Sequence, residues 1–94
     1  MEIDAIEKLA ATIKDRKIHP KEGSYTNSLF NAGENKIVKK LGEENAEFIK
    51  AFLTEPKDRI VGEAADIIYH LMVALEYKDI DFNELLLELK SRAR

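Results

Sequence analysis

The feature that most restricts the fold of this chain is a set of acidic residues placed symmetrically about the dipeptide Glu55-Pro56. The set consists of Glu44, Glu47, Glu63 and Asp66. The outer pair lies 11 residues on either side of Glu55, and the inner pair lies 8 residues on either side of it. Residues spaced i, i+3 share one face of a helix. If the chain reverses at Pro56, two antiparallel helices bring all four acids to one level, so the pattern predicts a helical hairpin.

Four carboxylates at one level need a compensating positive charge. Carboxylates about 4 Å apart repel by roughly 4 kcal/mol per pair at an effective dielectric constant of 20. That repulsion is large beside the roughly 5–15 kcal/mol that stabilises a whole domain. Oxygen ligands favour a hard cation, Mg²⁺ first and Mn²⁺ second. Because magnesium commonly bridges to phosphate oxygens, the set also indicates a phosphate-bearing substrate.

A plainer interpretation of acids on a helix is a solvated face with i, i+4 ion pairs, such as Lys39 with Glu43. The surroundings of Glu63 and Asp66 argue against it here, since the segment that carries them is apolar most of the way round. Acids on such a helix are costly without a partner charge. The metal site is therefore the favoured interpretation.

The rest of the pattern predicts an all-α fold in a single domain, residues 1–94. The chain is 45% apolar and 35% charged, which is typical of a globular protein. Long helices are predicted over about residues 3–16, 34–53, 56–76 and 81–92, with a loop at 17–26 and a short helical turn at 27–32 before Gly33. Asp81 and Glu84 have the spacing of a capping box at the last helix.

Apolar periodicity predicts how the hairpin helices are buried. The core face of the helix at 34–53 is expected to consist of Ile37, Leu41, Phe48 and Phe52. The helix at 56–76 is expected to be buried nearly everywhere, with Glu63, Asp66 and His70 on one narrow stripe. So short a chain leaves apolar surface uncovered, which predicts a homodimer with Leu71, Met72 and Leu75 packed in a bundle with the partner.

Composition excludes several classes of protein. The chain has no cysteine, so thiolate metal sites and thiol catalysis are excluded. No signal peptide or membrane span is visible, and we expect a cytoplasmic protein with no membrane partner. The formal net charge of −3 argues against nucleic acid as the main partner.

Three stretches together resemble phosphoribosyl-ATP pyrophosphatase, the second enzyme of histidine biosynthesis. They are Gly23-Ser24-Tyr25-Thr26, the run Lys-Ile-Val-Lys-Lys-Leu-Gly-Glu-Glu at 36–44, and Glu-Ala-Ala-Asp-Ile-Ile-Tyr-His at 63–70. The resemblance spans about residues 9–70. Its Glu-x-x-Glu and Glu-x-x-Asp motifs are shared with the wider all-α, MazG-like nucleoside triphosphate pyrophosphatase superfamily. The Ser-Tyr-Thr loop, the lysine run and the Tyr-His ending single out the histidine-pathway branch.

The resemblance implies Mg²⁺-dependent hydrolysis of the α–β phosphoanhydride of phosphoribosyl-ATP, giving phosphoribosyl-AMP and pyrophosphate. Magnesium would be held by Glu44, Glu47, Glu63 and Asp66. One of these acids, or Glu43, would act as the base for the attacking water, and the sequence does not choose among them. We expect the cyclohydrolase domain often fused to this enzyme to be absent. Asn45 departs from the small apolar residue usual in the family, and we expect it on the core side.

Further candidates for substrate binding each have a structural alternative. Lys36, Lys39 and Lys40 either bind phosphates or form a solvated face. Arg16 and Lys17 either reach a phosphate or complement a helix dipole. Ser24, Tyr25 and Thr26 either contact substrate or form a turn and a cap. His70 is either a substrate contact or a hydrogen-bonded structural residue.

Two rival functions remain open. One is a house-cleaning nucleoside triphosphate pyrophosphatase of the same superfamily, which an assay of phosphoribosyl-ATP against dUTP would separate. The other is a non-catalytic helical dimerisation module, in which the acids are surface charge and magnesium gives no thermal stabilisation.

Overall fold

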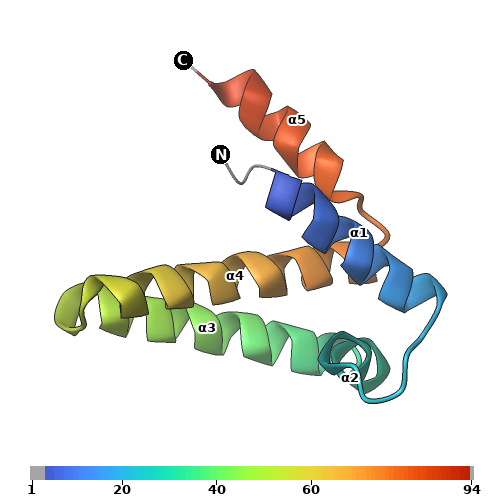
Figure 1. The fold of residues 1–94 in the computed structure, drawn as a ribbon, viewed down its shortest axis with the longest axis horizontal. Helices are drawn as coiled ribbons and strands as arrows, with labels where there is room; N and C mark the ends of the chain where they lie inside the picture. Colours follow the sequence, from blue (N-terminus) through green and yellow to red (C-terminus); the bar gives the residue numbers. More distant parts are fainter. Residues whose placement is uncertain (1–3, 94) are drawn as a thin grey trace.

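The computed structural model describes residues 4–93, and every regular element within them is an α-helix (Figure 1). The helices are α1 (Asp4–Ile18), α2 (Tyr25–Ala32), α3 (Glu34–Thr54), α4 (Lys57–Tyr77) and α5 (Phe82–Arg92). The all-α prediction is confirmed. The predicted start of the first helix, at Ile3, lies outside the described residues.

The predicted hairpin is present, and its turn is made by Glu55 and Pro56. Glu55 has extended backbone angles (φ −119°, ψ 162°), as expected for a residue that precedes proline. Pro56 caps α4 and so lies one residue before the helix rather than in its first turn as predicted. The two long helices run side by side from this turn, at the left of Figure 1.

The remaining helices gather at the other end of the hairpin. Gly33 alone joins α2 to α3, and its positive φ of 91° is a conformation that glycine adopts without strain. α2 begins two residues earlier than predicted because the Ser24 side chain accepts a hydrogen bond from the Asn27 amide (3.2 Å) and caps the helix. At α5 the predicted capping box of Asp81 and Glu84 is confirmed.

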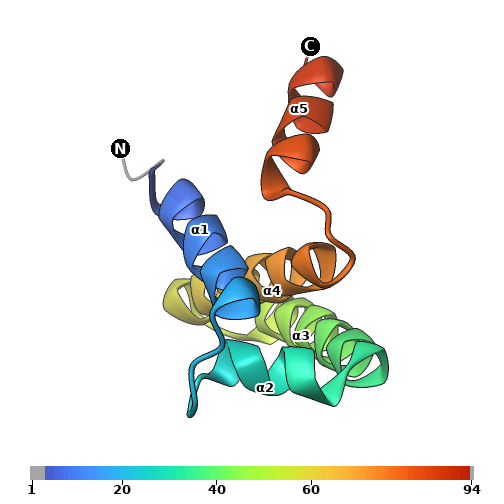
Figure 2. The ribbon, with the colours of Figure 1, turned by 90° about the vertical axis from the view of Figure 1, so that its right-hand side faces the viewer.

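The core lies where these helices meet the hairpin. One buried side chain from each of α1, α2 and α3 packs against two from α4, the set being Ile13, Leu29, Ile37, Met72 and Val73. Burying an aliphatic side chain contributes about 1.5–3 kcal/mol. This small cluster anchors the end of the hairpin that carries α2. Figure 2 shows α1 and α5 leaving that end in diverging directions.

The prediction that α4 is buried nearly everywhere is wrong for this single chain. Val61 is 59% exposed and Ile68 is 43% exposed. Val61 is uncovered because, among the described residues, the helices other than α3 lie at the far end of the hairpin from its turn (Figure 1). On α3, Phe52 belongs to the same uncovered half and is 63% exposed instead of being in the core. Leu41 and Phe48 are half-buried, and only Ile37 is buried as predicted.

Two further predictions about packing are corrected. Asn45 is exposed rather than on the core side, and its side-chain amide donates to the carbonyl of Leu41 (2.8 Å). Met72, expected at a partner subunit, is already buried at 2% exposure in the core of its own chain. Leu71 and Leu75 are half-buried.

Candidate functional site

The hairpin brings three of the four predicted acids into one group. Each of Glu44 on α3 and Glu63 and Asp66 on α4 has a carboxylate oxygen within 4.8 Å of the other two. Glu63 is buried at 7% exposure, Glu44 is half-buried and Asp66 is exposed. The group is therefore open to solvent on the Asp66 side. Glu47 is exposed and lies outside the group.

The donor set of this three-acid group fits a hard divalent cation. Oxygen ligands of one octahedral magnesium ion lie at most about 4.2 Å apart, twice the metal–oxygen bond of 2.1 Å. In this group the three carboxylate oxygens all lie within 4.8 Å of one another, close enough for one ion to reach them after small side-chain shifts. Carboxylate oxygens without nitrogen or sulfur ligands select Mg²⁺ or Mn²⁺ rather than softer metals.

Two basic residues already contact the acids. The Lys40 ammonium lies 3.4 Å from a Glu44 oxygen and 3.6 Å from a Glu43 oxygen. Burial opposes the charge on Lys40, but Tyr25 and the two carboxylates outweigh that effect and raise the pKa of Lys40. On the other side of the group, the Arg59 guanidinium donates to Glu63 (2.9 Å).

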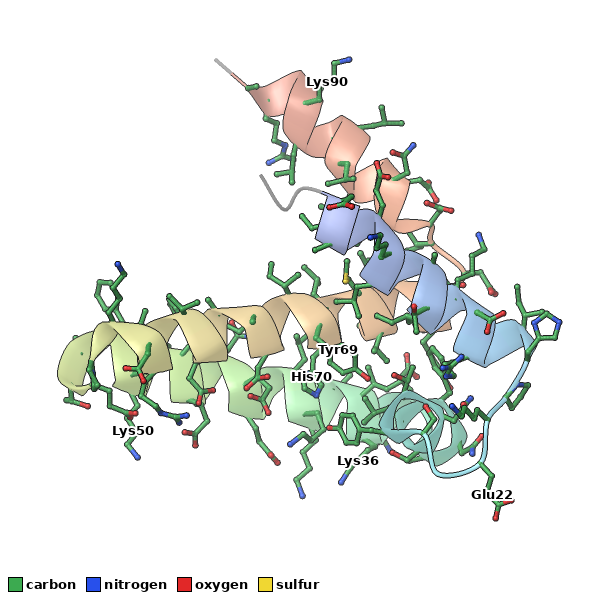
Figure 3. The ribbon with its side chains drawn as sticks, viewed as in Figure 1. Glu22, Lys36, Lys50, Tyr69, His70 and Lys90 are labelled. Carbon is green, nitrogen blue, oxygen red and sulfur yellow. The ribbon has the colours of Figure 1, made fainter. Side chains whose placement is uncertain are left out.

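His70 links the turn of α4 that carries Asp66 to the start of α2. Its Nδ1 donates to the backbone carbonyl of Asp66 (2.7 Å), which leaves Nε2 to accept from the Tyr25 hydroxyl (3.1 Å). Figure 3 shows His70 projecting from α4 on the side where α3 and α2 lie. His70 is therefore a hydrogen-bonded residue one turn from the three-acid group, in contact with a predicted substrate residue.

A second contact runs parallel to the first. The hydroxyls of Thr26 and Tyr69 share a hydrogen bond, and the rings of Tyr25 and Tyr69 stack with their centroids 6.1 Å apart. Burial raises the pKa of Tyr69, against the hydrogen bond from Thr26, which lowers it. These contacts dock the first turn of α2 on α4 beside the acids.

The other predicted substrate residues occupy different surroundings. Ser24 caps α2, so the structural alternative holds for its side chain. Lys36 and Lys39 are exposed, and Figure 3 shows Lys36 extending away from α3 near α2. Together with Lys40, they give the α2 end of the site a positive border.

Arg16 and Lys17 are not in contact with the acids. Lys17 donates to the carbonyl of Glu76 (2.7 Å) and pairs with Asp79, so it caps the carboxyl end of α4. This is the helix-dipole alternative, on a neighbouring helix. Arg16 pairs with Asp15 (3.1 Å).

Sequence reasoning missed three residues that shape the site. Arg59 and Tyr69 contact Glu63 and Thr26, as described above. Asn27 is buried and ties the preceding loop in place, accepting from the Lys21 amide (2.8 Å) and donating to the Arg16 carbonyl (2.7 Å). The i, i+4 spacing of Arg59 and Glu63 was a readable signal, whereas the contacts of Asn27 and Tyr69 depend on tertiary packing.

Comparison with known proteins identifies the family. The family model described as phosphoribosyl-ATP pyrophosphohydrolase matches residues 6–93. The chain belongs to this family. The three-acid group lies within the matched residues, and the resemblance inferred from the motifs is confirmed.

This chain is similar both to relatives of about its own length and to longer relatives. A phosphoribosyl-ATP pyrophosphatase of Methanocella arvoryzae is 43% identical over 93 residues, which cover 97% of this chain and 98% of the relative. The enzyme of the same name from Clostridium acetobutylicum is 45% identical over 89 residues, which cover 95% of this chain and 81% of the relative.

The longer relatives are named as bifunctional. The histidine biosynthesis bifunctional protein HisIE of Caldanaerobacter subterraneus is 51% identical over 90 residues, which cover 96% of this chain. The match covers 44% of that relative, so this chain spans less than half the length of the bifunctional protein.

None of the helices described within residues 4–93 combines the length and the hydrophobicity that a membrane span requires.

Proposed function

We propose that this chain hydrolyses phosphoribosyl-ATP at the α–β phosphoanhydride, releasing phosphoribosyl-AMP and pyrophosphate, as a step of histidine biosynthesis in the cytoplasm. The observation that carries the proposal is the three-acid group beside the docked turn of α2. The names of the relatives from Methanocella and Clostridium support the choice of substrate.

Glu44, Glu63 and Asp66 would hold a magnesium ion, with Mn²⁺ as a possible substitute, and Glu47 would turn in from one helical turn away. Magnesium bound there would neutralise charge on the phosphates and lower the pKa of a bound water. Because Glu44 is half-buried and Glu63 is buried, we expect their oxygens to be held in place before substrate arrives, which would limit the reorganisation needed for catalysis.

The residues of the chain have separate tasks in this proposal. Glu43, Glu44 or Glu47 accepts the proton of the attacking water. Lys40 forms ion pairs with Glu43 and Glu44, and its ammonium is placed to pair with a substrate phosphate instead. Lys36 and Lys39 add positive charge at the same end of the site.

The start of α2 is the proposed contact for the phosphoribosyl group. Tyr25 and Thr26 contact α4 beside the acids, through His70 and Tyr69. Ser24 and Tyr25 also line an open hollow, whose other polar side chains are Lys21, Glu22, Asn27, Ser28 and Asn31. Hydroxyls, amides and an ammonium suit a ribose phosphate. Lys17 contacts the end of α4 and Arg16 pairs with Asp15, so these two are the weakest of the proposed substrate contacts.

We also infer that the active form is a homodimer. The uncovered half of the hairpin presents Ile49, Phe52, Leu53 and Val61, each more than half exposed. Exposed large apolar side chains gathered on one part of a small domain are typical of a subunit interface. A second copy of the chain would cover them.

The test is pyrophosphate release from phosphoribosyl-ATP in the presence of magnesium, with dUTP and ATP as parallel substrates. The proposal predicts that phosphoribosyl-ATP has the highest kcat/KM and that phosphoribosyl-AMP is the second product. A preference for dUTP would reassign the chain to nucleotide-pool cleaning, and no turnover of any nucleotide would support the dimerisation module.

A further inference from the structure

Arg59 connects the hairpin turn to the buried member of the three-acid group. Its Nε donates to a Glu55 oxygen (3.2 Å) and its Nη2 donates to the Oε1 oxygen of Glu63 (2.9 Å). Each acid is four residues from Arg59, so the three side chains follow one side of the chain as it enters α4. The guanidinium is thus held at both ends, by a turn residue and by a proposed metal ligand.

Within this ion pair, Glu63 is the buried partner and so depends on the contact more than Arg59 does. Its side chain is 9% exposed, whereas the paired side chain of Arg59 is 55% exposed. Among the side chains that the structure describes, Arg59 is the one that donates a hydrogen bond to Glu63. A buried carboxylate without a donor is costly, so loss of Arg59 would drive Glu63 to turn toward water and away from Glu44 and Asp66.

We propose that Arg59 is a positioning residue that holds Glu63 toward the metal site and thereby sets the metal affinity. This inference rests on the proposed function, because it takes the three-acid group as a cation site. Arg59 engages one oxygen of Glu63, which leaves the other oxygen for an ion. Hydrogen-bond partners of metal ligands fix ligand orientation, and their loss commonly lowers metal affinity about 10–100-fold.

The charge of Arg59 acts in the opposite direction, because a guanidinium repels a nearby cation. Its exposed position lets water and salt screen that repulsion. The hydrogen bond that orients Glu63 lies in the buried part of the contact and is screened less. We therefore expect orientation to outweigh repulsion, and the sign of the change in metal affinity tests this directly.

The experiment is a titration with Mn²⁺ of wild type, Arg59→Met and Arg59→Lys, with free Mn²⁺ measured by electron paramagnetic resonance. We expect Arg59→Met to bind Mn²⁺ about 10–100-fold more weakly. Arg59→Lys keeps the charge but cannot bond Glu55 and Glu63 with the same fixed fork, so we expect a smaller loss. The matched control is Arg92→Met. It removes an arginine–glutamate pair of the same i, i+4 spacing, between Arg92 and Glu88 on α5 (2.8 Å), and should bind Mn²⁺ as wild type does.

Unchanged or tighter Mn²⁺ binding by Arg59→Met would overturn the proposal, and tighter binding would make Arg59 a competitor of the ion. Melting curves in EDTA check that each variant folds. If Arg59→Met does not fold, the Mn²⁺ affinities of Arg59→Lys and of Glu55→Gln, which weakens the other contact of Arg59, test the proposal instead. Both should bind Mn²⁺ more weakly than wild type, and wild-type affinity in both would overturn the proposal. If wild type binds no Mn²⁺, the metal site and the role of Arg59 both fail. If wild type binds Mn²⁺ but does not hydrolyse phosphoribosyl-ATP, the proposed function fails while the role of Arg59 is judged on affinity alone.

Discussion

At the scale of single residues, the acids show both the reach and the limit of a spacing argument. The symmetry about Glu55 predicted that acids of two helices would meet, and Glu44, Glu63 and Asp66 do meet. Positions three apart on a helix differ by about 60° around its axis. On α3 that rotation leaves Glu47 exposed while Glu44 is half-buried.

Glu47→Gln tests whether the fourth acid joins the site. Its side chain lies one helical turn from Glu44, so we expect it to turn to an ion held by the other three acids. The variant should lose the rise in melting temperature that magnesium gives wild type, and its rate should fall about 10²–10³-fold. Thermal melting with and without magnesium, beside a Glu88→Gln control on α5, measures the first effect. A Glu47→Gln protein that is stabilised and active like wild type would leave a site of three acids.

At the scale of elements, the ends of the helices could be predicted from local sequence, whereas the burial of the helices could not. The caps at Ser24 and Asp81 and the proline at the hairpin turn are visible in the sequence, so most helix ends were predicted within two residues. The exposure of Phe52 and Val61 was not predicted. Apolar periodicity shows which faces of a helix can be buried, but it does not show which neighbour covers them. The link between α2 and α4 also depends on tertiary packing.

The docking of α2 on α4 is expected to determine substrate choice. Replacing Tyr25 and Thr26 together by alanine removes the hydroxyl contacts to His70 and Tyr69. We expect kcat/KM for phosphoribosyl-ATP to fall at least about tenfold, roughly 1.4 kcal/mol of transition-state binding. Magnesium should still raise the melting temperature, because the acids are untouched. Wild-type kinetics in this variant would remove the α2 turn from the substrate site.

The start of α5 carries a prediction about pH. Hydrogen bonds from the Asn83 amide and from Lys14 hold the pKa of Asp81 below its ordinary value of 3.8. Because the folded-state pKa is the lower one, Asp81 stabilises the fold above pH 3.8, and this contribution is lost as pH falls through the folded-state pKa. Asp81→Ala should therefore lower the melting temperature by a few degrees at pH 7 and make little difference in stronger acid. An equal gap between wild type and variant at both pH values would contradict this account.

At the scale of the whole molecule, the uncovered half of the hairpin predicts self-association. A homodimer that buries this surface should reach the roughly 1,200–2,000 Å² typical of stable interfaces. Sedimentation at micromolar concentration should show no monomer for wild type. Phe52→Glu should dissociate the dimer, whereas Ile18→Glu, at an equally exposed apolar position on α1, should not. A fully active wild-type monomer would refute the dimer.

Magnesium-dependent hydrolysis of phosphoribosyl-ATP at the three-acid group is the proposal on which the other site predictions depend. Its most direct test is pyrophosphate release from phosphoribosyl-ATP by wild type and Asp66→Asn across a range of magnesium concentrations. Asp66 is exposed, so this change should leave the fold intact while it removes one ligand charge. We predict saturable magnesium dependence in wild type and a rate about 10²–10³-fold lower in the variant at every magnesium concentration. An Asp66→Asn protein with wild-type rate and wild-type magnesium dependence would contradict the account.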